Sequence, residues 1–308
     1  MHSKSLTVRV PASTSNLGSG FDTLSAALNL HLILRVEVIG EGETEWVQGD
    51  SPQTAFPEEN NLVAKALDGA ASQFGIKLPG LRISMHNPIP LQRGLGSSAA
   101  AIIGGIKIAE RLHGEPLSQK QIFQVAYPLE GHPDNLAASL TGGWVLSLCR
   151  NDQIEVHRLT SNLSVRFVLA VPEKSVSTQE ARAILPDSYS LQDATYNLQR
   201  CALLIHALSA GRKELLSEAM SDRLHQPFRS RLVSGMEELL DVDELDEEMA
   251  SSLLGICISG SGSTMVALAD GHFEEIGQWM VRVFSRHDTE ASYQVRDLDM
   301  EGAQVLTD

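Results

Sequence analysis

The chain has 308 residues, of which 43% are hydrophobic, and a formal net charge of −15. This length predicts two domains, and a surface this acidic disfavours nucleic acid and anionic lipid as partners. The sequence has no apolar run of about 18 residues, no signal-peptide core at its start and no CxxC pair among three widely spaced cysteines, so it predicts a reduced, cytoplasmic protein.

In the first half of the chain, strand patterns alternate with helix patterns. Apolar alternation predicts strands, and helical spacing that ends at Gly75 predicts a helix. The strands are expected at 6–10, 30–40 and 81–87, and the helix at 58–75. Residues 11–29 predict a turn-forming loop followed by a short helix. Pro88 and Pro90 predict an extended segment after the third strand.

After this extended segment, helices are expected from Ser97 to Gly114 and over 117–131. The second half predicts a strand at 165–172, helices between 191 and 240, two strands joined by a glycine-rich loop at 253–270, a helix at 273–287 and a short terminal strand. The stretch 236–250 carries eight carboxylates and is interpreted as a solvated acidic helix or loop. The mixture predicts an α+β protein with a domain boundary near 150–160.

The segment QRGLGSSAAAIIGG combines glycine and serine at a predicted helix start. Unpaired backbone N–H groups at such a start lie at the positive end of the helix dipole and bind anions such as phosphate. Gly94 and Gly96 allow the backbone to approach an anion closely. Ser97 and Ser98 can cap the helix, bond a phosphate oxygen or bind Mg²⁺. The alternative is a serine-capped core helix in which glycine serves only a turn.

Two common nucleotide-binding motifs do not describe this segment. No Gly-Lys-Ser or Gly-Lys-Thr occurs in the chain, so the lysine of the Walker loop is missing. GLGSSA fits G-x-G-x-x-A, but in the dinucleotide-binding fold the first glycine directly follows the first strand. Here the motif begins at Gly94 and two prolines precede it, so that fold is disfavoured.

Three further segments carry groups suited to chemistry. LEGHPDNLAASLTGG places Glu130 and Asp134 around a His-Pro turn, which suits Mg²⁺ and a substrate group or, equally, a helix cap. TSNLGSGFD offers the amide of Asn16 and the carboxylate of Asp22, and by itself indicates a surface turn. SGSGST (259–264) by itself indicates a hairpin connection between two strands.

Together and in this order, the four segments resemble the GHMP kinase superfamily, which phosphorylates small metabolites from ATP without a Walker lysine. PLQRGLGSSAA is similar to its central motif, P-x-x-x-G-L-G-S-S-A-A, at every defining position. Within the superfamily, the pattern most resembles the homoserine kinase family. That family's segments P-x-T-S-A-N-L-G-P-G-F-D, E-G-H-P-D-N and T-x-x-A-R-x-x-L-P are similar to PASTSNLGSGFD, EGHPDN and TQEARAILP here. The similarity covers most of the chain.

The sequence also departs from that family's pattern. Ser19 stands where the family usually has proline, and Ser261 and Ser263 replace alanine and proline in the last motif. These changes affect the stiffness of the loops more than their charge. The first motif has neither the lysine of mevalonate kinase and diphosphocytidyl-methylerythritol kinase nor the arginine of galactokinase.

The resemblance implies a two-domain GHMP kinase fold that binds ATP between the domains. Residues 1–155 would form an ATP-binding domain of the ribosomal-protein-S5-domain-2-like type, and residues 156–308 a ferredoxin-like domain. Ser98 and Glu130 would bind Mg²⁺, and Asn60 and Asn61 would contact adenine. The implied nucleotide-binding residues are Asn61, Pro90, Arg93, Gly94, Leu95, Gly96, Ser97, Ser98 and Ala99.

The implied substrate is L-homoserine, which would be converted to O-phospho-L-homoserine for threonine biosynthesis. By resemblance, Asp22 would take the ammonium, and Arg182 and Arg229 the carboxylate, since a guanidinium matches it with two hydrogen bonds. Asn16, His132 and Asp134 would line the pocket. The catalytic residues are predicted to be Glu130, Asp134, Asn135 and Arg182.

Among these, Asp134 and Asn135 would orient the reacting hydroxyl. A strong general base is not expected, because phosphoryl transfer has a loose transition state. Two alternatives stay open: another small-alcohol kinase of the superfamily, and a ligand sensor of the same fold without catalysis. The sequence does not decide whether the protein is a homodimer.

Overall fold

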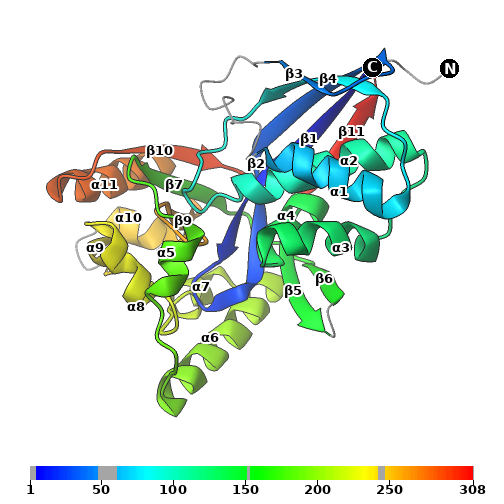
Figure 1. Cartoon of the computed structure of the whole chain (residues 1–308). Coiled ribbons are helices and arrows are strands. Elements are labelled where there is room, and N and C mark those ends of the chain that lie inside the picture. Colours follow the sequence, from blue (N-terminus) through cyan, green and yellow to red (C-terminus); the bar gives the residue numbers. More distant parts are fainter. Residues whose placement is uncertain (1–4, 48–60, 151–152, 242–246, 308) are drawn as a thin grey trace.

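The computed structural model describes residues 5–47, 61–150, 153–241 and 247–307. These residues form two sheets with helices packed against them (Figure 1). The seven-stranded sheet comes mainly from the first half of the chain and the four-stranded sheet from the second. This arrangement confirms the predicted α+β fold class.

The first sheet is built on a long antiparallel pair, β1 (Ser5–Asn16) and β2 (Gly20–Gly40). Its other strands are β3 (Glu45–Val47), β4 (Gly80–His86), β5 (Trp144–Arg150), β6 (Gln153–Leu159) and β11 (Gln304–Thr307). Its helices are α1 (Leu62–Phe74), α2 (Ser97–His113), α3 (Gln119–Glu130) and α4 (Asp134–Thr141). Strand β11 pairs with β1, so the end of the chain returns to the first sheet. The predicted boundary at residues 155 and 156 stays a prediction.

The second sheet has the ferredoxin-like order. Its strands β7 (Arg166–Pro172), β8 (Leu253–Ile258), β9 (Met265–Ala269) and β10 (Ala291–Arg296) lie side by side as β10-β7-β9-β8, all antiparallel. Its helices and those around it are α5 (Thr178–Ala183), α6 (Leu191–Ala210), α7 (Leu216–Ala219), α8 (Gln226–Arg229), α9 (Met236–Leu240), α10 (Glu247–Ser252) and α11 (Phe273–Arg286). No helix of the described residues is long and apolar enough to cross a membrane.

The prediction for residues 11–29 was wrong. Strand β1 continues to Asn16, β2 begins at Gly20, and only the turn between them is irregular. The expected short helix is therefore part of β2, whose residues Ser25 and Ala26 pair with both β1 and β5. A short run of small apolar residues has no decisive period, and pairing on both sides overrides its helical preference.

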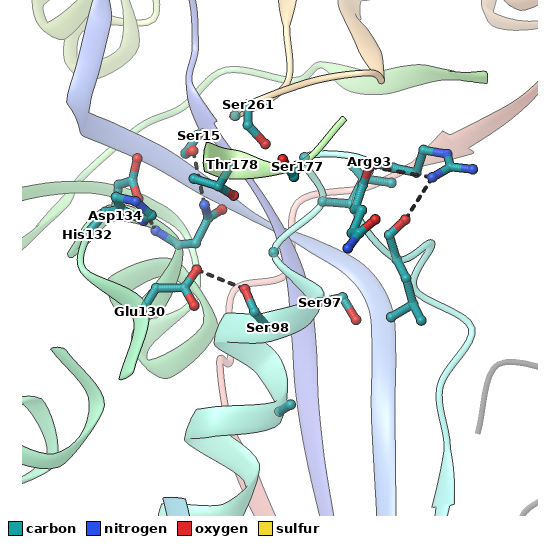
Figure 2. Close-up of a pocket in the computed structure, with 18 of the residues that line it drawn as sticks. Ser15, Arg93, Ser97, Ser98, Glu130, His132, Asp134, Ser177, Thr178 and Ser261 are labelled. Atoms are coloured by element: carbon teal, nitrogen blue, oxygen red, sulfur yellow. Dashed lines mark hydrogen bonds between the residues drawn. The ribbon is translucent and has the colours of Figure 1, made fainter. Parts of the chain in front are cut away.

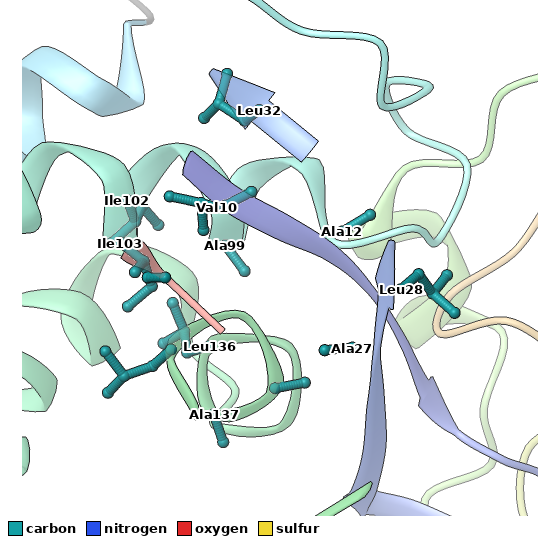
Figure 3. Packing of buried hydrophobic residues seen from close by; sticks show 14 of the residues in the cluster. Val10, Ala12, Ala27, Leu28, Leu32, Ala99, Ile102, Ile103, Leu136 and Ala137 are labelled. Atoms are coloured by element: carbon teal, nitrogen blue, oxygen red, sulfur yellow. The ribbon is translucent and has the colours of Figure 1, made fainter. Parts of the chain in front are cut away.

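Small residues bring α2 close to the sheet and to α1. Ala99 and Ile103 of α2 lie against Val10 of β1 and Leu136 of α4 (Figure 3). A Cβ atom at Gly105 would stand 2.3 Å from the Val63 carbonyl oxygen of α1, so glycine is required at this crossing. This close packing fixes the position of the first turn of α2.

Candidate active site

A cavity of about 530 Å³ lies where residues of both halves of the chain meet. All the site residues predicted from the sequence line it except Ala99, which is buried in the core. Those residues are Asn16, Asp22, Asn61, Pro90, Arg93, Gly94, Leu95, Gly96, Ser97, Ser98, Glu130, His132, Asp134, Asn135, Arg182 and Arg229. Asn60 lies outside the described residues.

One end of the cavity, the glycine end, consists of residues 94–98. Gly94 and Gly96 have φ angles of 73° and 67°, in the left-handed region that favours glycine. A Cβ atom at Gly94 would stand 2.0 Å from the Ser259 carbonyl oxygen, and one at Gly96 would stand 2.0 Å from the Ser13 hydroxyl oxygen. Packing against β1 and against the loop after β8 therefore demands both glycines, in addition to any close approach of a ligand.

Hydrogen bonds join the glycine end to the first and last sequence motifs. The Ser259 hydroxyl donates to the Gly94 carbonyl at 2.7 Å. The Ser13 amide donates to the Leu95 carbonyl at 3.1 Å, and the Gly260 amide donates to the Ser15 carbonyl at 3.1 Å. The first and last motifs are therefore not independent surface turns but parts of one buried assembly.

The first turn of α2 keeps backbone donors at the cavity wall. Gly96 occupies the cap position, and no side chain caps the helix. The Ser97 hydroxyl accepts from the Asn87 amide at 3.1 Å, while the Ser98 hydroxyl donates to Glu130 Oε1 at 2.8 Å. The serine-capped core helix is therefore excluded, and the N–H groups of this turn are available to an anion.

Two carboxyl groups beside this turn have raised pKa values (Figure 2). Burial raises the pKa of Glu130 to about 7; the Ser98 hydroxyl opposes this shift, and nearby Asp134 adds to it. Burial, and then the charge of Asp22, raise the pKa of Asp134 to about 6. The Asn135 amide donates to Asp134 Oδ1 at 2.7 Å. Carboxylates with raised pKa values gain from a nearby cation.

A second group of lining residues, the charged end, consists of Asp22, Arg182 and Arg229. Arg182 Nη2 donates to both carboxylate oxygens of Asp22, at 2.8 and 3.0 Å. Buried Arg229 donates to the Ala181 and Gly260 carbonyls, each at 3.0 Å. Burial, and then the charge of Arg182, lower the pKa of Arg229 to about 10. The group predicted to take an ammonium thus pairs with a group predicted to take a carboxylate.

An aromatic pair supports the charged end. The Arg182 and Arg229 guanidinium carbons lie 5.7 and 5.1 Å from the centroid of the Phe21 ring. The same ring stacks on the buried His225, with the two ring centroids 5.3 Å apart. Cation–π contacts of this kind favour two guanidinium groups near one ring. Phe21 therefore holds both arginines beside Asp22, the residue that follows it in the chain.

Three predicted site residues use their polar atoms to shape the cavity. Asn16 donates to the Gly260 carbonyl at 2.8 Å and accepts from the Asp22 amide at 3.0 Å. Asn135 accepts from the Ser13 hydroxyl at 2.9 Å and donates to Ser15 Oγ at 3.2 Å. The Arg93 guanidinium donates to the carbonyls of Leu91, Pro172 and Glu173, so it holds the glycine end to β7 (Figure 2).

Two other predicted residues occupy different parts of the wall. Asn61 caps α1, and its side-chain oxygen accepts from the Val63 amide at 3.0 Å. His132 also lines the cavity, and burial, and then the charge of Arg182, lower its pKa. A lowered pKa favours the neutral imidazole, which adds no positive charge beside the arginines.

Sequence reasoning missed part of the lining. The additional residues are Ser15, Leu62, Val63, Leu91, Gln92, Ala101, Ser177, Thr178, Gly260 and Ser261. Ser15, Thr178, Gly260 and Ser261 belong to the sequence motifs, so their presence in those motifs was a usable signal. The apolar lining residues gave no such signal, because an apolar residue in a cavity wall and one in the core have the same sequence pattern.

Comparison with known proteins places the chain among small-molecule kinases. The family described as GHMP kinases N terminal domain matches residues 61–143. The chain is similar to the homoserine kinase of Persephonella marina, with 36% identity over 98% of each chain. It is also similar to that of Desulfitobacterium hafniense, with 38% identity over 97% of this chain and 99% of the relative.

A solved structure shares the whole architecture. The crystal structure of homoserine kinase from Cytophaga hutchinsonii superposes with a TM-score of 0.84 at 27% sequence identity, and 98% of each chain is covered. The likeness therefore extends over both sheets and over the cavity residues contributed by each half of the chain.

Proposed function

Because this chain belongs to the homoserine kinase family of the GHMP kinases, we propose that it transfers a phosphoryl group from ATP to the side-chain hydroxyl of L-homoserine. As a member of this family the protein is a kinase that uses ATP. The product, O-phospho-L-homoserine, serves threonine biosynthesis. We also assign the reaction to the cytoplasm, because Cys149, Cys201 and Cys257 are free thiols, as is typical of reducing compartments.

One observation carries the assignment of residues: a single cavity has both an anion-binding wall and a pair of opposite charges. The backbone N–H groups of the first turn of α2 suit the phosphates of ATP, since no side chain caps them. Asp22 and Arg182 suit an amino acid, which carries one positive and one negative group. A nucleotide and an amino acid can therefore meet in a single cavity.

We propose that homoserine opens the contact between Asp22 and Arg182. The substrate ammonium then binds Asp22, and the substrate carboxylate binds Arg182 and Arg229. One ion pair within the protein is exchanged for two ion pairs with the ligand, so neither charged group is left without a partner. A neutral alcohol cannot replace the ion pair between Asp22 and Arg182 with new ion pairs. The site therefore prefers a zwitterion.

The side chains at the centre of the cavity orient the acceptor hydroxyl. Asp134 and Asn135 lie at the start of α4, where Asn135 is close to Gly96 and the charges of Asp22 and Arg182 act on Asp134. Asp134 accepts a hydrogen bond from the hydroxyl and directs the oxygen toward the phosphate. Little prior deprotonation is required, because the transition state is loose and positioning supplies much of the acceleration.

The residues beside the glycine end suit Mg²⁺, which we propose as the metal of the reaction. Ser98 Oγ and Glu130 Oε1 lie 2.8 Å apart and both residues line the cavity. Mg²⁺ prefers oxygen ligands and usually takes only one or two carboxylates, together with phosphate oxygens and water. The described residues accordingly contain no cluster of three or more His, Cys, Asp or Glu side chains that could hold a metal. Bound there, Mg²⁺ would neutralise the charge that develops on the phosphoryl group.

A coupled assay of ADP release tests the proposed function. Purified protein with MgATP is given homoserine, mevalonate, galactose or threonine as acceptor. We expect rapid turnover with homoserine. Turnover with mevalonate but not homoserine would assign the protein to another kinase of the superfamily. No turnover with any alcohol, combined with thermal stabilisation by homoserine, would favour the non-catalytic sensor.

A further inference from the structure

The turn that joins β1 to β2 has a strained backbone. Asn16, Leu17 and Asp22 have φ angles of 69°, 48° and 52°, in the left-handed region that glycine adopts freely and other residues adopt at a cost. Asp22 belongs to the charged end, and its amide donates a hydrogen bond to Asn16. A strained backbone beside a functional group persists only where neighbouring contacts hold it. The contacts that hold residues 16–22 therefore determine where the Asp22 carboxylate lies.

The buried side chain of His225 contacts this turn at two points. Its Nε2 lies 2.9 Å from the Gly18 carbonyl oxygen, across 207 positions of the chain. Its ring stacks on Phe21, with the two planes 25° apart. The imidazole therefore holds one part of the turn through a hydrogen bond and another through a ring face. Phe21, which it holds by stacking, directly precedes Asp22.

The hydrogen bond to Gly18 distinguishes histidine from an apolar ring at this position. Donation to a carbonyl places the proton on Nε2 of His225, which leaves Nδ1 as an acceptor. Nδ1 is buried and has no hydrogen-bond partner among the described residues. Burial lowers the pKa of His225, the charge of Asp222 opposes this shift, and the charge of Arg229 adds to it. A neutral imidazole with one unpaired nitrogen costs free energy that an apolar ring would not, and the bond to Gly18 offsets this cost.

The backbone of His225 belongs to the same helical turn as Arg229. His225 directly precedes α8, and the Arg229 amide donates to its carbonyl oxygen at 2.9 Å. The buried Asp222 side chain accepts from the amides of His225 and Gln226, at 2.8 and 2.7 Å, and so fixes the start of this helix. One residue therefore links the backbone that carries Arg229 to the turn that carries Asp22.

Other groups hold the middle of the turn but do not make this link. The Asn197 amide donates to the Ser19 carbonyl at 2.8 Å, and the Ser19 hydroxyl donates to the Ala219 carbonyl at 2.7 Å. These bonds fix Ser19, whereas His225 holds Phe21, the ring beside which both arginines of the charged end lie. His225 is itself absent from the described lining of the cavity. It therefore acts on a ligand there only through the residues that it holds.

We propose that His225 is a positioning residue for homoserine, and that its imidazole sets the spacing between Asp22 and the two arginines. This inference rests on the proposed function, because it concerns how that substrate is held. The ammonium and carboxylate of an α-amino acid are bonded to the same carbon atom, so the groups that bind them must keep a fixed spacing. Without the imidazole, the strained turn relaxes, Phe21 moves, and the charged end no longer matches both groups of the substrate.

Two substitutions separate the two contacts of the imidazole. His225→Gln keeps an N–H donor but loses the ring, and His225→Phe keeps a ring but loses the donor. In either variant the KM for homoserine, and the Kd for homoserine measured by calorimetry, should rise by about 3- to 10-fold, as expected for the loss of one ring contact or one hydrogen bond. KM for ATP should change little, because the contacts of His225 lie at the charged end.

His31→Gln is the matched control. The His31 Nε2 lies 2.8 Å from the Asp299 carboxylate, a contact that also joins distant segments, and His31 is not among the described lining residues of the cavity. Thermal unfolding should occur at a lower temperature in all three variants, whereas KM for homoserine should rise only in the two His225 variants. A merely structural role for His225 would make its variants behave like the control.

Phe21→Leu tests the route of the effect. His225→Gln keeps a donor for Gly18, so its effect should arise from the loss of the contact with Phe21. In a protein that already carries Phe21→Leu, His225→Gln should therefore raise KM for homoserine much less than it does in the wild type. An equal rise in both proteins would show that the imidazole does not act through this ring.

Two results overturn the proposal: a KM and Kd for homoserine that are unchanged in both His225 variants, or an effect of His225→Gln that is undiminished beside Phe21→Leu. Failure of the proposed function gives a different result. A wild-type protein that binds homoserine without turnover would refute the kinase activity, while the Kd values of the variants would still test the spacing. A wild-type protein that neither binds nor phosphorylates homoserine would overturn both.

Discussion

The glycine end and the charged end of the cavity are held in place by different kinds of contact. At the glycine end, backbone hydrogen bonds join two loops to strand β1, and at Gly94 and Gly96 even one Cβ atom would collide with a neighbour. At the charged end, long side chains pair with one another and rest on an aromatic ring. Asp22 and Arg182 are each about one-third exposed, and their contact faces the cavity.

This difference separates a rigid binding surface from an exchangeable one. Backbone groups locked by neighbouring loops cannot rearrange cheaply, so the phosphate-binding end is prepared before ATP arrives. Side-chain ion pairs can open, and a zwitterionic ligand offers each partner a replacement. We therefore expect substitutions at the glycine end to affect folding and ATP together, and substitutions at the charged end to affect mainly the amino-acid substrate.

Gly94→Ala should produce the largest effect. Its Cβ atom would stand 2.0 Å from the Ser259 carbonyl oxygen, which is backbone and cannot rotate away. We expect a loss of about 3–5 kcal/mol in the free energy of unfolding, measured by urea denaturation. ATP binding, measured by calorimetry, should also be lost.

Gly114→Ala is the matched control for this substitution. Gly114 also has a left-handed φ, 83°, but its added Cβ atom would meet nothing within 4 Å. The substitution should therefore cost only the strain of the backbone, about 1 kcal/mol in the free energy of unfolding, and ATP binding should be retained. Equal losses of stability in the two variants would show that the glycine end is not rigid.

Glu130→Gln should produce the next largest effect, and it should fall on turnover. The amide keeps the shape of the side chain but removes the charge proposed to bind Mg²⁺. We expect kcat to fall by about 10²–10³-fold, as when an electrostatic stabiliser is removed. ATP affinity measured without Mg²⁺ should change little. A variant with near wild-type kcat would transfer the metal-binding role to Asp134.

Arg182→Met should affect the amino-acid substrate selectively. Loss of one charged hydrogen-bond donor costs about 1.5–3 kcal/mol, so KM for homoserine should rise by about 10- to 100-fold. KM for ATP should be almost unchanged. The variant should also narrow the difference in kcat/KM between homoserine and 3-aminopropan-1-ol, which lacks the carboxylate.

The ratio between these two alcohols distinguishes recognition from general damage. A partly unfolded variant lowers both rates in proportion, whereas loss of carboxylate recognition lowers mainly the homoserine rate. Arg229→Met is less selective, because it also removes the hydrogen bonds that this buried side chain donates to the carbonyls of Ala181 and Gly260. If the ratio is unchanged in both variants, neither arginine recognises the carboxylate.

The glycine end could be predicted from sequence because its chemistry is local. Gly94, Gly96 and Ser98 lie within a few residues of a helix start, and the spacing alone indicates an anion site. The left-handed φ angles agree with that interpretation. What the spacing could not show is that Ser13 and Ser259 pack against these glycines, since those contacts join segments far apart in the chain.

The ion pair at the charged end and the order of strands in the first sheet depend on contacts between residues that are far apart in the chain. Asp22 and Arg182 are separated by 160 positions, and no local pattern indicates that they pair. The pairing of β11 with β1 joins opposite ends of the chain, and was equally invisible. Ser25 and Ala26 became part of a strand because two other strands flank them. All three features are decided by pairing between segments far apart in the chain, whereas a sequence pattern indicates only the local structure of neighbouring residues.

The smallest predicted effect concerns the stability of the metal-free protein as a function of pH. The pKa of Glu130 is about 7 in the folded protein and 4.5 without the fold. Between these values the folded chain binds more protons than the unfolded chain, so stability falls as pH rises. Glu130 is only partly buried and lines a cavity, so the cost is about 1–2 kcal/mol rather than the full value for a fully buried carboxylate.

Glu130→Gln removes this titration and should therefore gain stability relative to wild type as pH rises from 5 to 8. Urea unfolding of both proteins in the presence of a chelator, at pH 5 and at pH 8, measures how the difference between their free energies of unfolding changes with pH. Glu180→Gln should change stability with pH in the opposite direction. Hydrogen bonds with Ser177 hold the pKa of exposed Glu180 below its ordinary value. This carboxylate therefore stabilises the folded protein at pH 8 and loses that effect in acid. If the Glu130→Gln difference is the same at pH 5 and 8, the carboxylate is not buried enough to need a cation. The backbone N–H groups at the start of α2 would then have to supply the charge neutralisation that we assign to Ser98 and Glu130 with Mg²⁺.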